Sequence, residues 1–532
     1  MRIGFVGLAL AAAVIAGTWA WLGAPAAMPH APLAAGEKLW CISYAPYRGS
    51  QTPYDPGTKI TAAQIEEDLE RLSKITGCVR TYSDNQGVEQ VPALAAKHGL
   101  KVLQGIWLSG DRAKDDPQIR AGIELAKAYP DTIRALVVGN EVLLRGEMSG
   151  PDLAATIRAV KAQVKVPVTY ADVWEFWLRH PDVAGAVDFI TIHILPYWED
   201  FPIPAAQAAA HVEAIRQKVA RALPGKEIVI GEVGWPSAGR MREGALPSKA
   251  NQARVIQDVL ALAKRENFKV NVIESFDAPW KRAQEGTVGG HWGLLDGASR
   301  EPKFVWGQAV SNHPSWFWQA AGGIAFAGLI FAAAFVTARR RKHRPAVWFA
   351  VAANAIAGGL LIGWAVENVG LESLGLGMWI RSLALVAVAL ASPVVASVAT
   401  VAGMPLPSLS SVLSLEGLRR HDRLAAVLGL VAAVTLVLSL QIAFGLVFDP
   451  RYKDFPFAPL TAAVVPLFVH GLVVARGDGR RGAAETAGMA LLALSVIYIV
   501  PNEGFANWQS MWLCAALAAF AFRLFLVRGA PG

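Results

Sequence analysis

The stretch Trp40-Cys-Ile-Ser-Tyr-Ala-Pro-Tyr47 decides between the two folds that the rest of the sequence allows. It is a short run of β-branched and aromatic residues, which is typical of a strand. From Lys38 onward such runs alternate with helical patterns, as they do in folds with a parallel sheet. A doubly wound open sheet usually carries a Gly-rich phosphate loop after its first strand. Tyr44-Ala-Pro-Tyr47 offers no such loop, so the sequence favours a closed (β/α)8 barrel.

Seven more strand candidates follow the first one, separated by helical stretches, and eight such repeats are the signature of a (β/α)8 (TIM) barrel. The eight candidates are Trp40–Pro46, Cys78–Ser83, Lys101–Leu108, Ala135–Glu141, Pro167–Val173, Phe189–Tyr197, Glu227–Trp235 and Val270–Phe276. The clearest helical patterns are Thr61–Ile75, Pro151–Val164 and Ser248–Lys264. The last of these begins with a serine that can cap a helix.

After Pro314 the composition changes to long apolar runs, several of them near the length that spans a bilayer. These runs cover residues 316–337, 346–366, 382–402, 425–447, 460–475, 486–501 and 509–527. The fold class that we predict is therefore α/β, a barrel followed by an all-α, multi-span transmembrane domain. The predicted domains are a signal anchor or signal peptide (1–29), an extracytoplasmic barrel (30–312) and a membrane domain of about seven helices (313–532).

The first segment leaves two alternatives open. Its apolar stretch to Trp21 or Leu22 is nearly long enough to span a bilayer, which slightly favours an uncleaved anchor. Gly23-Ala-Pro-Ala-Ala27 is also compatible with cleavage of a signal peptide. Both alternatives place residue 30 and those that follow it outside the cytoplasm.

The distribution of positive charge supports the same topology. Clusters of Lys and Arg lie at residues 339–344, 419–423 and 476–481, in alternate loops between the apolar runs. Such loops stay on the cytoplasmic side of a membrane. We therefore expect a multi-pass protein of the cytoplasmic (inner) membrane whose barrel faces the periplasm or exterior. The net charge of +8 is explained by these clusters, so we expect no nucleic-acid partner.

The three cysteines do not have the spacing of metal ligands. Cys41 and Cys78 both fall at the starts of neighbouring predicted strands. In an extracytoplasmic domain they can form a disulfide, and the alternative of two buried free thiols stays open. His and Asp residues also lack metal-ligand spacing, so we expect no metal and no other cofactor.

Two glutamates end predicted strands in settings that suggest chemistry. Glu141 follows Val137-Val-Gly-Asn140, and Glu232 is framed by Gly231 and Gly234. Reactive residues of barrel enzymes lie at the carboxyl ends of the strands. The alternative for Glu141 is an acid that stabilises the start of a following helix.

A pair of carboxylates at one barrel mouth suits the cleavage of glycosidic bonds, in which one acid protonates the leaving oxygen and the other attacks the anomeric carbon. The acid then needs a raised pKa, which we expect burial and the neighbouring carboxylate to supply.

The segment from Trp40 to Phe304 resembles glycoside hydrolase family 17, the β-1,3-glucanases and glucanosyltransferases. The resemblance rests on four motifs in the family's order. They are Val79-Arg80-Thr81-Tyr82, Val138-Gly-Asn140-Glu141-Val142, Ile230-Gly-Glu232-Val-Gly234-Trp235-Pro236-Ser237 and Glu274-Ser-Phe276-Asp277-Ala-Pro-Trp280-Lys281. With its helical tail, the whole chain resembles bacterial membrane proteins labelled β-(1-6)-glucan synthases, although no nucleotide-sugar transferase domain is evident.

The resemblance implies a retaining enzyme with Glu141 as acid/base and Glu232 as nucleophile. It also implies that Asn140 binds the sugar 2-hydroxyl and that Glu274 and Lys281 tune the charge of the site. Aromatic residues just past strands are candidate sugar platforms, with rim packing as the alternative for each. The full set of expected substrate-binding residues is Tyr44, Arg80, Tyr82, Asn140, Tyr170, Trp174, Tyr197, Trp235, Glu274, Phe276, Trp280 and Lys281. Of the aromatics, Tyr44, Tyr197 and Trp235 are the favoured ones, whereas His193 is more simply explained as a satisfied interior histidine.

The expected function is a retaining β-1,3-glucan hydrolase or transglucosylase that remodels or builds periplasmic or cell-surface glucan, including β-1,6 branches. The expected partners are β-glucan, the lipid bilayer and a glucan synthase or export partner. The alternative is a glucan-binding module that serves a membrane complex for glucan export or synthesis. Intact Glu141 and Glu232 in their full motifs argue against this alternative, since binding needs neither acid.

Overall fold

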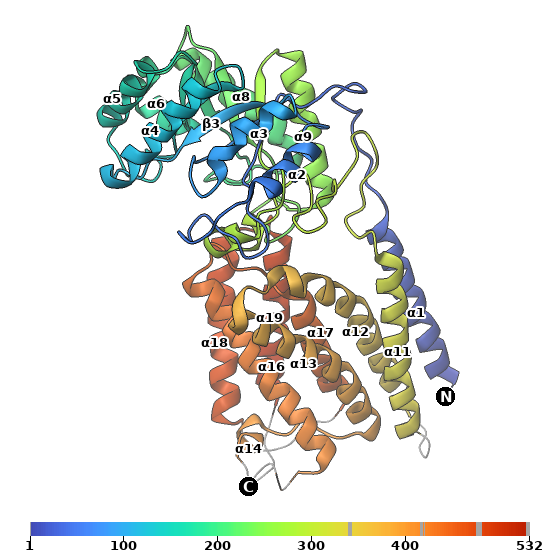
Figure 1. Cartoon of the computed structure of the whole chain (residues 1–532). Helices are drawn as coiled ribbons and strands as arrows, with labels where there is room; N and C mark the ends of the chain where they lie inside the picture. Colours follow the sequence, from blue (N-terminus) through green and yellow to red (C-terminus); the bar gives the residue numbers. More distant parts are fainter. Residues whose placement is uncertain (1, 339–342, 415–418, 420, 475–480, 528–532) are drawn as a thin grey trace. The chain divides into compact units, whose positions relative to one another are not determined.

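The computed structural model describes residues 2–338, 343–414, 419, 421–474 and 481–527 (Figure 1). The chain divides into two compact units. The barrel unit comprises Ala26–Ala238 and Gly244–Val310, and the helical unit comprises Met1–Pro25, Gly239–Glu243 and Ser311–Gly532.

Eight parallel strands close into a barrel in sequence order, which confirms the predicted (β/α)8 fold. The strands are β1 (Cys41–Ser43), β2 (Cys78–Arg80), β3 (Lys101–Ile106), β4 (Ile133–Asn140), β5 (Val168–Val173), β6 (Ile190–His193), β7 (Ile228–Val233) and β8 (Lys269–Val272). Each one overlaps a predicted strand. Most of the predicted strands continue past the observed ends, because the residues there turn outward to form the loops of the barrel mouth.

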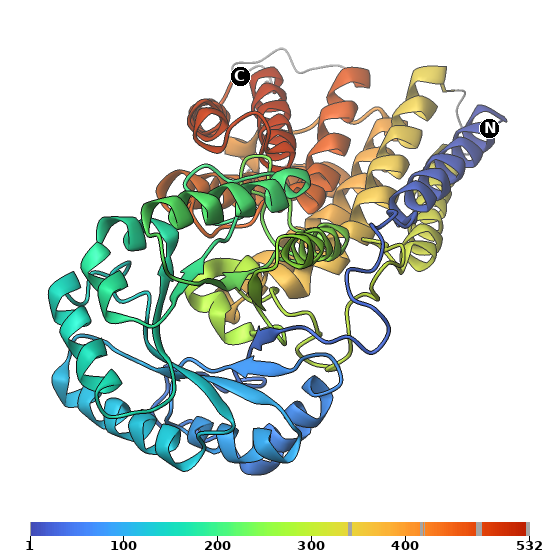
Figure 2. The same cartoon turned by 90° about the horizontal axis from the view of Figure 1, so that it is seen from above.

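Helices surround the strands of the barrel unit (Figure 2). They are α2 (Ala62–Leu72), η1 (Val88–Gln90), α3 (Val91–Lys97), α4 (Arg112–Ala128), α5 (Gly150–Lys161), α6 (Trp174–Arg179), α7 (Pro181–Ala186), η2 (Ala205–Gln207), α8 (Ala208–Ala222), α9 (Lys249–Arg265), η3 (Pro279–Lys281) and α10 (Arg282–Gly289). Ser248 caps α9 as predicted, since its side chain accepts a hydrogen bond from the Asn251 amide.

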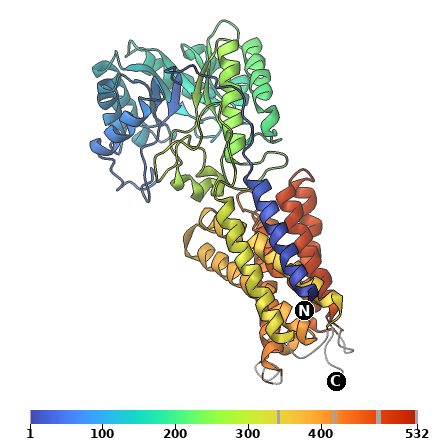
Figure 3. The same cartoon turned by 90° about the vertical axis from the view of Figure 1, so that its right-hand side faces the viewer.

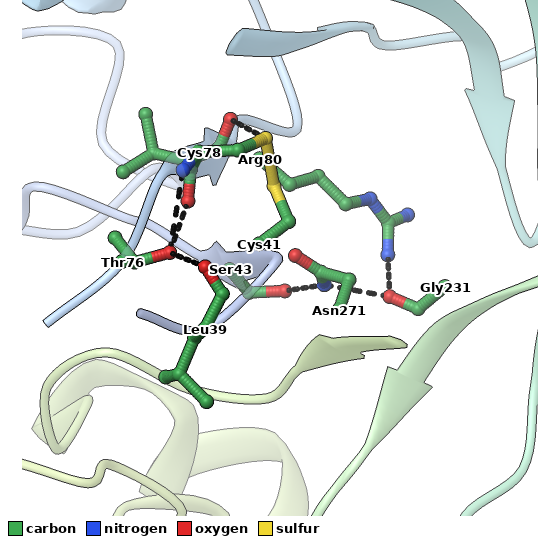
Figure 4. The surroundings of a disulfide bond; sticks show 9 residues. Leu39, Cys41, Ser43, Thr76, Cys78, Arg80, Gly231 and Asn271 are labelled. Carbon is green, nitrogen blue, oxygen red and sulfur yellow. Dashed lines mark hydrogen bonds between the residues drawn. A yellow bond between two sulfur atoms is a disulfide. The ribbon is translucent and has the colours of Figure 1, made fainter. Parts of the chain in front are cut away.

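A disulfide joins Cys41 of β1 to Cys78 of β2 inside the barrel, which settles the alternative between a disulfide and free thiols (Figure 4). The two cysteines pack with the small and apolar side chains of Leu103, Ala135 and other neighbours in one buried cluster. Two residues further along the same strands lie Ser43 and Arg80, which pair in register across β1 and β2. Because side chains on one face of a strand repeat every second residue, the disulfide lies one step below Ser43 and Arg80.

The helical unit is built from apolar helices, most of them long, together with the single-turn helix α14 (Figure 3). They are α1 (Arg2–Gly23), α11 (Trp316–Ala338), α12 (Pro345–Glu372), α13 (Gly375–Ala402), α14 (Leu409–Val412), α16 (Arg423–Phe448), α17 (Phe457–Val473), α18 (Ala483–Glu503) and α19 (Trp508–Leu526). Among the described residues, seven helices are long and apolar enough to cross a membrane, α1 and six that follow the barrel. The fifth predicted run of the tail, 460–475, forms the shorter apolar helix α17.

Helix α1 packs against α11 although the whole barrel separates them in the sequence. Ala11, Ile15 and Trp19 share one buried apolar cluster with Phe331 and other residues of α11. The sequence places three basic clusters in alternate loops of the tail. Most of their residues, 339–342, 420 and 476–480, lie outside the described part of the chain.

Candidate active site

Glu141 directly follows the last residue of β4. Its φ is +55° and that of Gly139 is +88°, so the chain turns sharply here and carries the carboxylate out of the strand. A side chain at position 139 would approach the Val142 side chain to 2.9 Å, and glycine avoids this approach. The alternative explanation of Glu141 as the first acid of a helix is wrong, because α5 begins only at Gly150 and is capped by Ser149.

Glu232 is the last residue but one of β7 and is buried, with 5% of its surface exposed. The glycines on either side permit close packing. A Cβ on Gly231 would lie 2.4 Å from the Thr191 side chain, and one on Gly234 would lie 2.2 Å from the Ile273 carbonyl oxygen. Across β6 and β7, Glu232 is in register with His193.

The two glutamates and His193 form one cluster. One carboxylate oxygen of Glu141, one of Glu232 and a ring nitrogen of His193 all lie within 4.8 Å of one another. Carboxyl groups of retaining glycosidases are about 5–5.5 Å apart, whereas those of inverting enzymes are about 6.5–9.5 Å apart. An oxygen–oxygen distance of at most 4.8 Å lies on the retaining side of this division, in which a carboxylate attacks directly without a water between the two acids.

Such a cluster also has the ligand types of a cation site. Arg80 Nη1, however, lies 3.1 Å from Glu232 Oε1 and 3.3 Å from His193 Nε2. A guanidinium, which stays charged at any ordinary pH, thus already occupies the position beside these two ligand atoms where a metal cation would lie. We assign no metal to the cluster on the basis of this contact.

Glu232 is held by two donors. Arg80 donates to its Oε1 at 3.1 Å, and the Tyr82 hydroxyl donates to the same oxygen at 2.8 Å. Burial, followed by the charge of Glu232, raises the pKa of Tyr82 well above its usual value, so this hydroxyl keeps its proton. Both donors stabilise an ionised carboxylate.

Arg80 is itself fixed by the layer of side chains around it. It donates to the Gly231 carbonyl oxygen at 2.7 Å and to the Asn140 side-chain oxygen. Asn271 donates to the same Gly231 oxygen at 2.7 Å and to Ser43 Oγ at 2.8 Å, as Figure 4 shows. Asn140, expected to bind a sugar hydroxyl, is therefore oriented by the residue that holds Glu232.

Glu141 has a different environment. His193 Nδ1 lies 2.9 Å from Glu141 Oε1, and a quarter of the Glu141 side chain remains exposed. Burial raises the pKa of Glu141, but the hydrogen bond to His193 and nearby positive charges, those of Arg145 and Arg80 among them, outweigh it and leave the pKa lowered. The expectation of a raised pKa is wrong for this structure, because it took no account of the donor at Oε1.

A second ion pair lies at the end of β8. Lys281 Nζ donates to Glu274 Oε2 at 2.8 Å. Burial is the main cause that raises the pKa of Glu274, and the Glu232 charge adds to it. Burial also raises the pKa of Glu285 to about 7, and charges that include Glu274, Glu141 and Glu232 act in the same direction. The charge of Glu274 thus interacts with that of Glu232, and the tuning of the two acids by Glu274 and Lys281 stays a prediction.

The aromatic side chains expected to bind sugar fall into two groups. Five are buried and packed in the barrel unit: Tyr44, Tyr170, Trp174, Tyr197 and Trp235. Tyr44 donates to Asp68, Tyr170 to Asp172, and the indole of Trp235 to the Leu246 carbonyl. These five offer no open ring face in this structure, and their binding of sugar stays a prediction.

The second group lies nearer the mouth. Trp280 is half-buried and meets the rings of Tyr47 and Tyr54 edge-on, at centroid distances of 5.8 Å and 5.7 Å. Phe276 is buried beneath the Arg300 guanidinium. Tyr82 contacts Glu232 directly, and the Trp280 ring lies beside Lys281. Of the predicted aromatics, these two are therefore the ones that lie beside Glu232 or beside the Lys281–Glu274 pair.

Sequence reasoning missed several residues of this site. His193 contacts Glu141, Arg145 donates to the Asn140 carbonyl oxygen and to that of Leu108, and the exposed Tyr54 stands beside Trp280. Asp172 accepts from Tyr170 and from the Leu144 amide in the turn after Glu141. The position of His193 at the end of a strand is a usable sequence signal. Arg145 and Tyr54 come from loops, whose paths the sequence does not predict, and Asp172 lies in β5, where no sequence motif marks it.

The chain resembles known glycoside hydrolases over part of its length. Residues 41–293 match the family model described as the BtgE/BtgC glycoside hydrolase domain. A glucan 1,3-beta-glucosidase from Arthroderma benhamiae is 28% identical over 266 residues, which are 46% of this chain and 83% of that protein. A glucan 1,3-beta-glucosidase from Schizosaccharomyces pombe is 29% identical over 236 residues, which are 40% of this chain and 72% of that protein.

Among solved structures, the glycoside hydrolase family 17 beta-1,3-glucanosyltransferase from Rhizomucor miehei is similar to this chain. The two are 26% identical with a TM-score of 0.44, over 50% of this chain and 95% of the other. All these matches cover only about half of the chain.

Proposed function

We propose that the barrel, a glycoside hydrolase domain of the family 17 type, cleaves β-1,3-glucan with retention of configuration and passes the released glucosyl unit to water or to another glucan chain. The observation that carries the proposal is the pair of strand-end carboxylates, Glu141 and Glu232, whose oxygens lie within 4.8 Å of each other. The β-1,3 linkage rests on the similarity to glucan 1,3-beta-glucosidases over most of their length.

In the first step Glu232 acts as the nucleophile. Its carboxylate, which accepts hydrogen bonds from Arg80 and Tyr82, attacks the anomeric carbon. Glu141 gives its proton to the glycosidic oxygen, which leaves with the electron pair of the broken bond. The result is a glucosyl ester on Glu232 and an ionised Glu141.

The lowered pKa of Glu141 in the free protein suits the second step, in which Glu141 acts as a base. A sugar in the mouth excludes water from Glu141, and this desolvation favours the protonated form that the first step needs. Asn140, fixed by Arg80, would bind the sugar 2-hydroxyl next to Glu232. Glu141 then takes a proton from the incoming hydroxyl, and the oxygen of that hydroxyl displaces Glu232.

The acceptor decides the outcome. Water gives hydrolysis, whereas the hydroxyl of a second glucan chain gives a longer or branched product without a nucleotide sugar. Attack by a 6-hydroxyl would make a β-1,6 branch. A glucan-remodelling or glucan-building role follows from such transfer.

We place this chemistry outside the cytoplasm. Seven long apolar helices support anchoring in a membrane, the basic loops between them favour an inner-membrane topology with the barrel on the far side, and the Cys41–Cys78 disulfide suits an oxidising compartment. In this proposal residues 30–312 form the extracytoplasmic domain and residues 313–532 the membrane domain. The partners are β-glucan, the lipid bilayer and a glucan synthase or export protein.

The test uses the full chain in detergent micelles with a defined β-1,3-glucan oligosaccharide. Product lengths are followed by mass spectrometry, and the configuration of the first product by proton NMR. Glu232→Gln is the inactive control, and Glu124→Gln, an exposed residue of α4, is the matched substitution. Products that retain the β configuration, absent with Glu232→Gln, support the proposal. Products longer than the substrate establish transfer.

No turnover by the wild-type chain on any β-glucan would contradict the proposal and favour a binding module. An α-configured first product would contradict the retaining mechanism while leaving a glycosidase.

A further inference from the structure

His193 touches both halves of the catalytic pair, and nothing in the proposed mechanism yet uses it. It ends β6, and 1% of its surface is exposed. Its Nδ1 lies 2.9 Å from Glu141 Oε1, and its Nε2 lies 3.3 Å from Arg80 Nη1 and 3.6 Å from Glu232 Oε1. The ring is packed against Gly231, where a Cβ would come within 3.2 Å of it.

The partner at Nε2 decides which nitrogen carries the proton. Arg80 has only donors and cannot accept a hydrogen bond. Nε2 therefore faces a group that cannot accept its proton, whereas Nδ1 lies 2.9 Å from a Glu141 carboxylate oxygen that can, so a neutral ring carries its proton on Nδ1. Nδ1–H then donates to Glu141 Oε1.

We propose that His193, with its proton held on Nδ1 by Arg80, is a positioning residue that makes Glu141 Oε1 a permanent acceptor and so reserves Oε2 for the catalytic proton. An oxygen that accepts a hydrogen bond from a fixed N–H has no room for a proton on the same side. Oε2 has no hydrogen-bond partner among the described residues, and the Glu141 side chain is a quarter exposed. This inference rests on the proposed function, because it assigns the proton that Glu141 transfers.

The same contacts couple the two carboxylates. In the free protein the charge of Arg80 is balanced by Glu232. When Glu232 becomes an ester it loses its negative charge, and the unbalanced guanidinium then favours the ionised form of Glu141 through His193. Glu141 is thereby prepared to act as a base in the step that follows.

The charged and titratable groups around the ring are few. They are Arg80 of β2, Glu141 after β4, Asp172 of β5 and Glu232 of β7. Loss of the His193 donor removes the contact that lowers the pKa of Glu141 most strongly, so that pKa rises. Of these four groups, only Glu141 loses a hydrogen bond shorter than 3 Å when the ring is replaced by phenylalanine.

The test compares His193→Phe, which removes both nitrogens, with His193→Asn, whose amide N–H can stand near the place of Nδ1. The full-length variants are assayed on aryl β-glucosides or β-1,3-linked diglucosides whose leaving groups span a wide range of acidity. For poorly acidic leaving groups, which need the proton, His193→Phe should lose about 10–100-fold in kcat/KM, and His193→Asn should recover most of it. A dinitrophenyl leaving group needs no proton and should be cleaved at nearly the wild-type rate.

The pH profile gives a second readout that a merely structural role would not change. The alkaline limb of kcat/KM on glucan should move to higher pH in His193→Phe and stay near its wild-type place in His193→Asn. Cleavage of the dinitrophenyl substrate by His193→Phe also shows that the barrel is folded.

A loss of equal size for every leaving group, with an unmoved alkaline limb, would overturn the role of His193 while leaving the proposed function intact. A wild-type chain inactive on all these substrates would instead overturn the proposed function, and this inference with it.

Discussion

Glu141 and Glu232 carry the same side chain at the ends of two strands of one barrel, yet their surroundings differ. Glu232 is almost fully buried and receives hydrogen bonds from Arg80 and Tyr82, neither of which gives up its proton near neutral pH. Glu141 is a quarter exposed, and its carboxylate contacts an imidazole. The first environment holds the carboxylate in place between two donors, whereas the second leaves part of the carboxylate open to an incoming group. A nucleophile needs the former and an acid/base the latter.

The strongest test of this contrast is the dependence on the leaving group. Glu141→Gln should lower kcat/KM on β-1,3-glucan by about 10²–10⁴-fold, because the leaving oxygen is no longer protonated. The same variant should cleave a dinitrophenyl glucoside to its glucosyl ester at close to the wild-type rate, measured as a burst of dinitrophenolate. Glu232→Gln should show no burst at all. A burst in Glu232→Gln but none in Glu141→Gln would reverse the two roles.

Removal of the Cys41–Cys78 disulfide tests whether the environment of Glu232 depends on the layer of barrel side chains beneath Ser43 and Arg80. Replacing Cys41 and Cys78 by serine opens a loop with a sequence separation of 37 residues. The barrel should lose about 3–4 kcal/mol of stability, seen as a lower midpoint of thermal unfolding. Cys514→Ser is the control, since that cysteine is free and lies in α19.

The double variant should also slow formation of the ester on Glu232 at temperatures where the barrel is still folded. The reason is that Ser43 and Arg80 are the next inward residues on the two strands that the disulfide joins. Unchanged ester formation would show that the Glu232 environment is independent of the disulfide.

Tyr82 is a further difference between the two acids, because its hydroxyl donates to Glu232 and not to Glu141. Tyr82→Phe removes one hydrogen bond to a charged group, an effect of about 1.5–3 kcal/mol, or about 10–100-fold in rate. The loss should be similar for every leaving group. Steady-state rates on the same aryl series provide the measurement, and a loss confined to poor leaving groups would assign Tyr82 to Glu141 instead.

Asp84 is another carboxylate of the barrel unit, and unlike Glu141 and Glu232 it has no donor beside it among the described residues. It lies four residues after β2 ends, it is buried, and neither of its oxygens has a hydrogen-bond partner within the part of the chain that the structure describes. Burial raises its pKa to about 8. The folded protein therefore holds a proton that the unfolded chain has released above pH ~4.

Stability of the barrel should accordingly fall as pH rises from about 4 to about 8, by at most about 1.4 kcal/mol per pH unit from this group. Asp84→Asn should flatten the fall of the unfolding midpoint over that range, while Asp131→Asn, at an exposed position, should not. Equal pH dependence in wild type and Asp84→Asn would show that Asp84 has a partner in solution.

The fold was predictable because its signals are local. Eight apolar runs separated by helical patterns predict the strands, and the missing glycine loop after Tyr44 predicts closure. Positions of Glu141 and Glu232 followed from the rule that reactive groups lie where strands end. Helix caps such as Ser248 were equally local, and the apolar runs of the tail became helices close to their predicted limits.

The partners of these acids were less accessible, because they depend on register and on side-chain direction. His193 contacts Glu141 for two reasons that the sequence does not show. The register of β6 and β7 places His193 opposite Glu232, and the lack of a side chain at Gly231 leaves room for the imidazole ring. Tyr44, Tyr197 and Trp235 have the composition of sugar platforms, but each fills space within the barrel unit. Composition does not say which side of the backbone faces the mouth.

The measurement that tests the central claim most directly is covalent trapping of the nucleophile. The full chain is incubated with a 2-deoxy-2-fluoro-β-glucosyl or β-1,3-diglucosyl fluoride, whose good leaving group forms the ester and whose fluorine slows its breakdown. Peptide mass spectrometry then locates the sugar. We predict one label, on Glu232, which is released from the wild-type chain when a glucan acceptor is added. Glu141→Gln should form the same label. A label on Glu141, or turnover of glucan with no label and an inverted product, would contradict it.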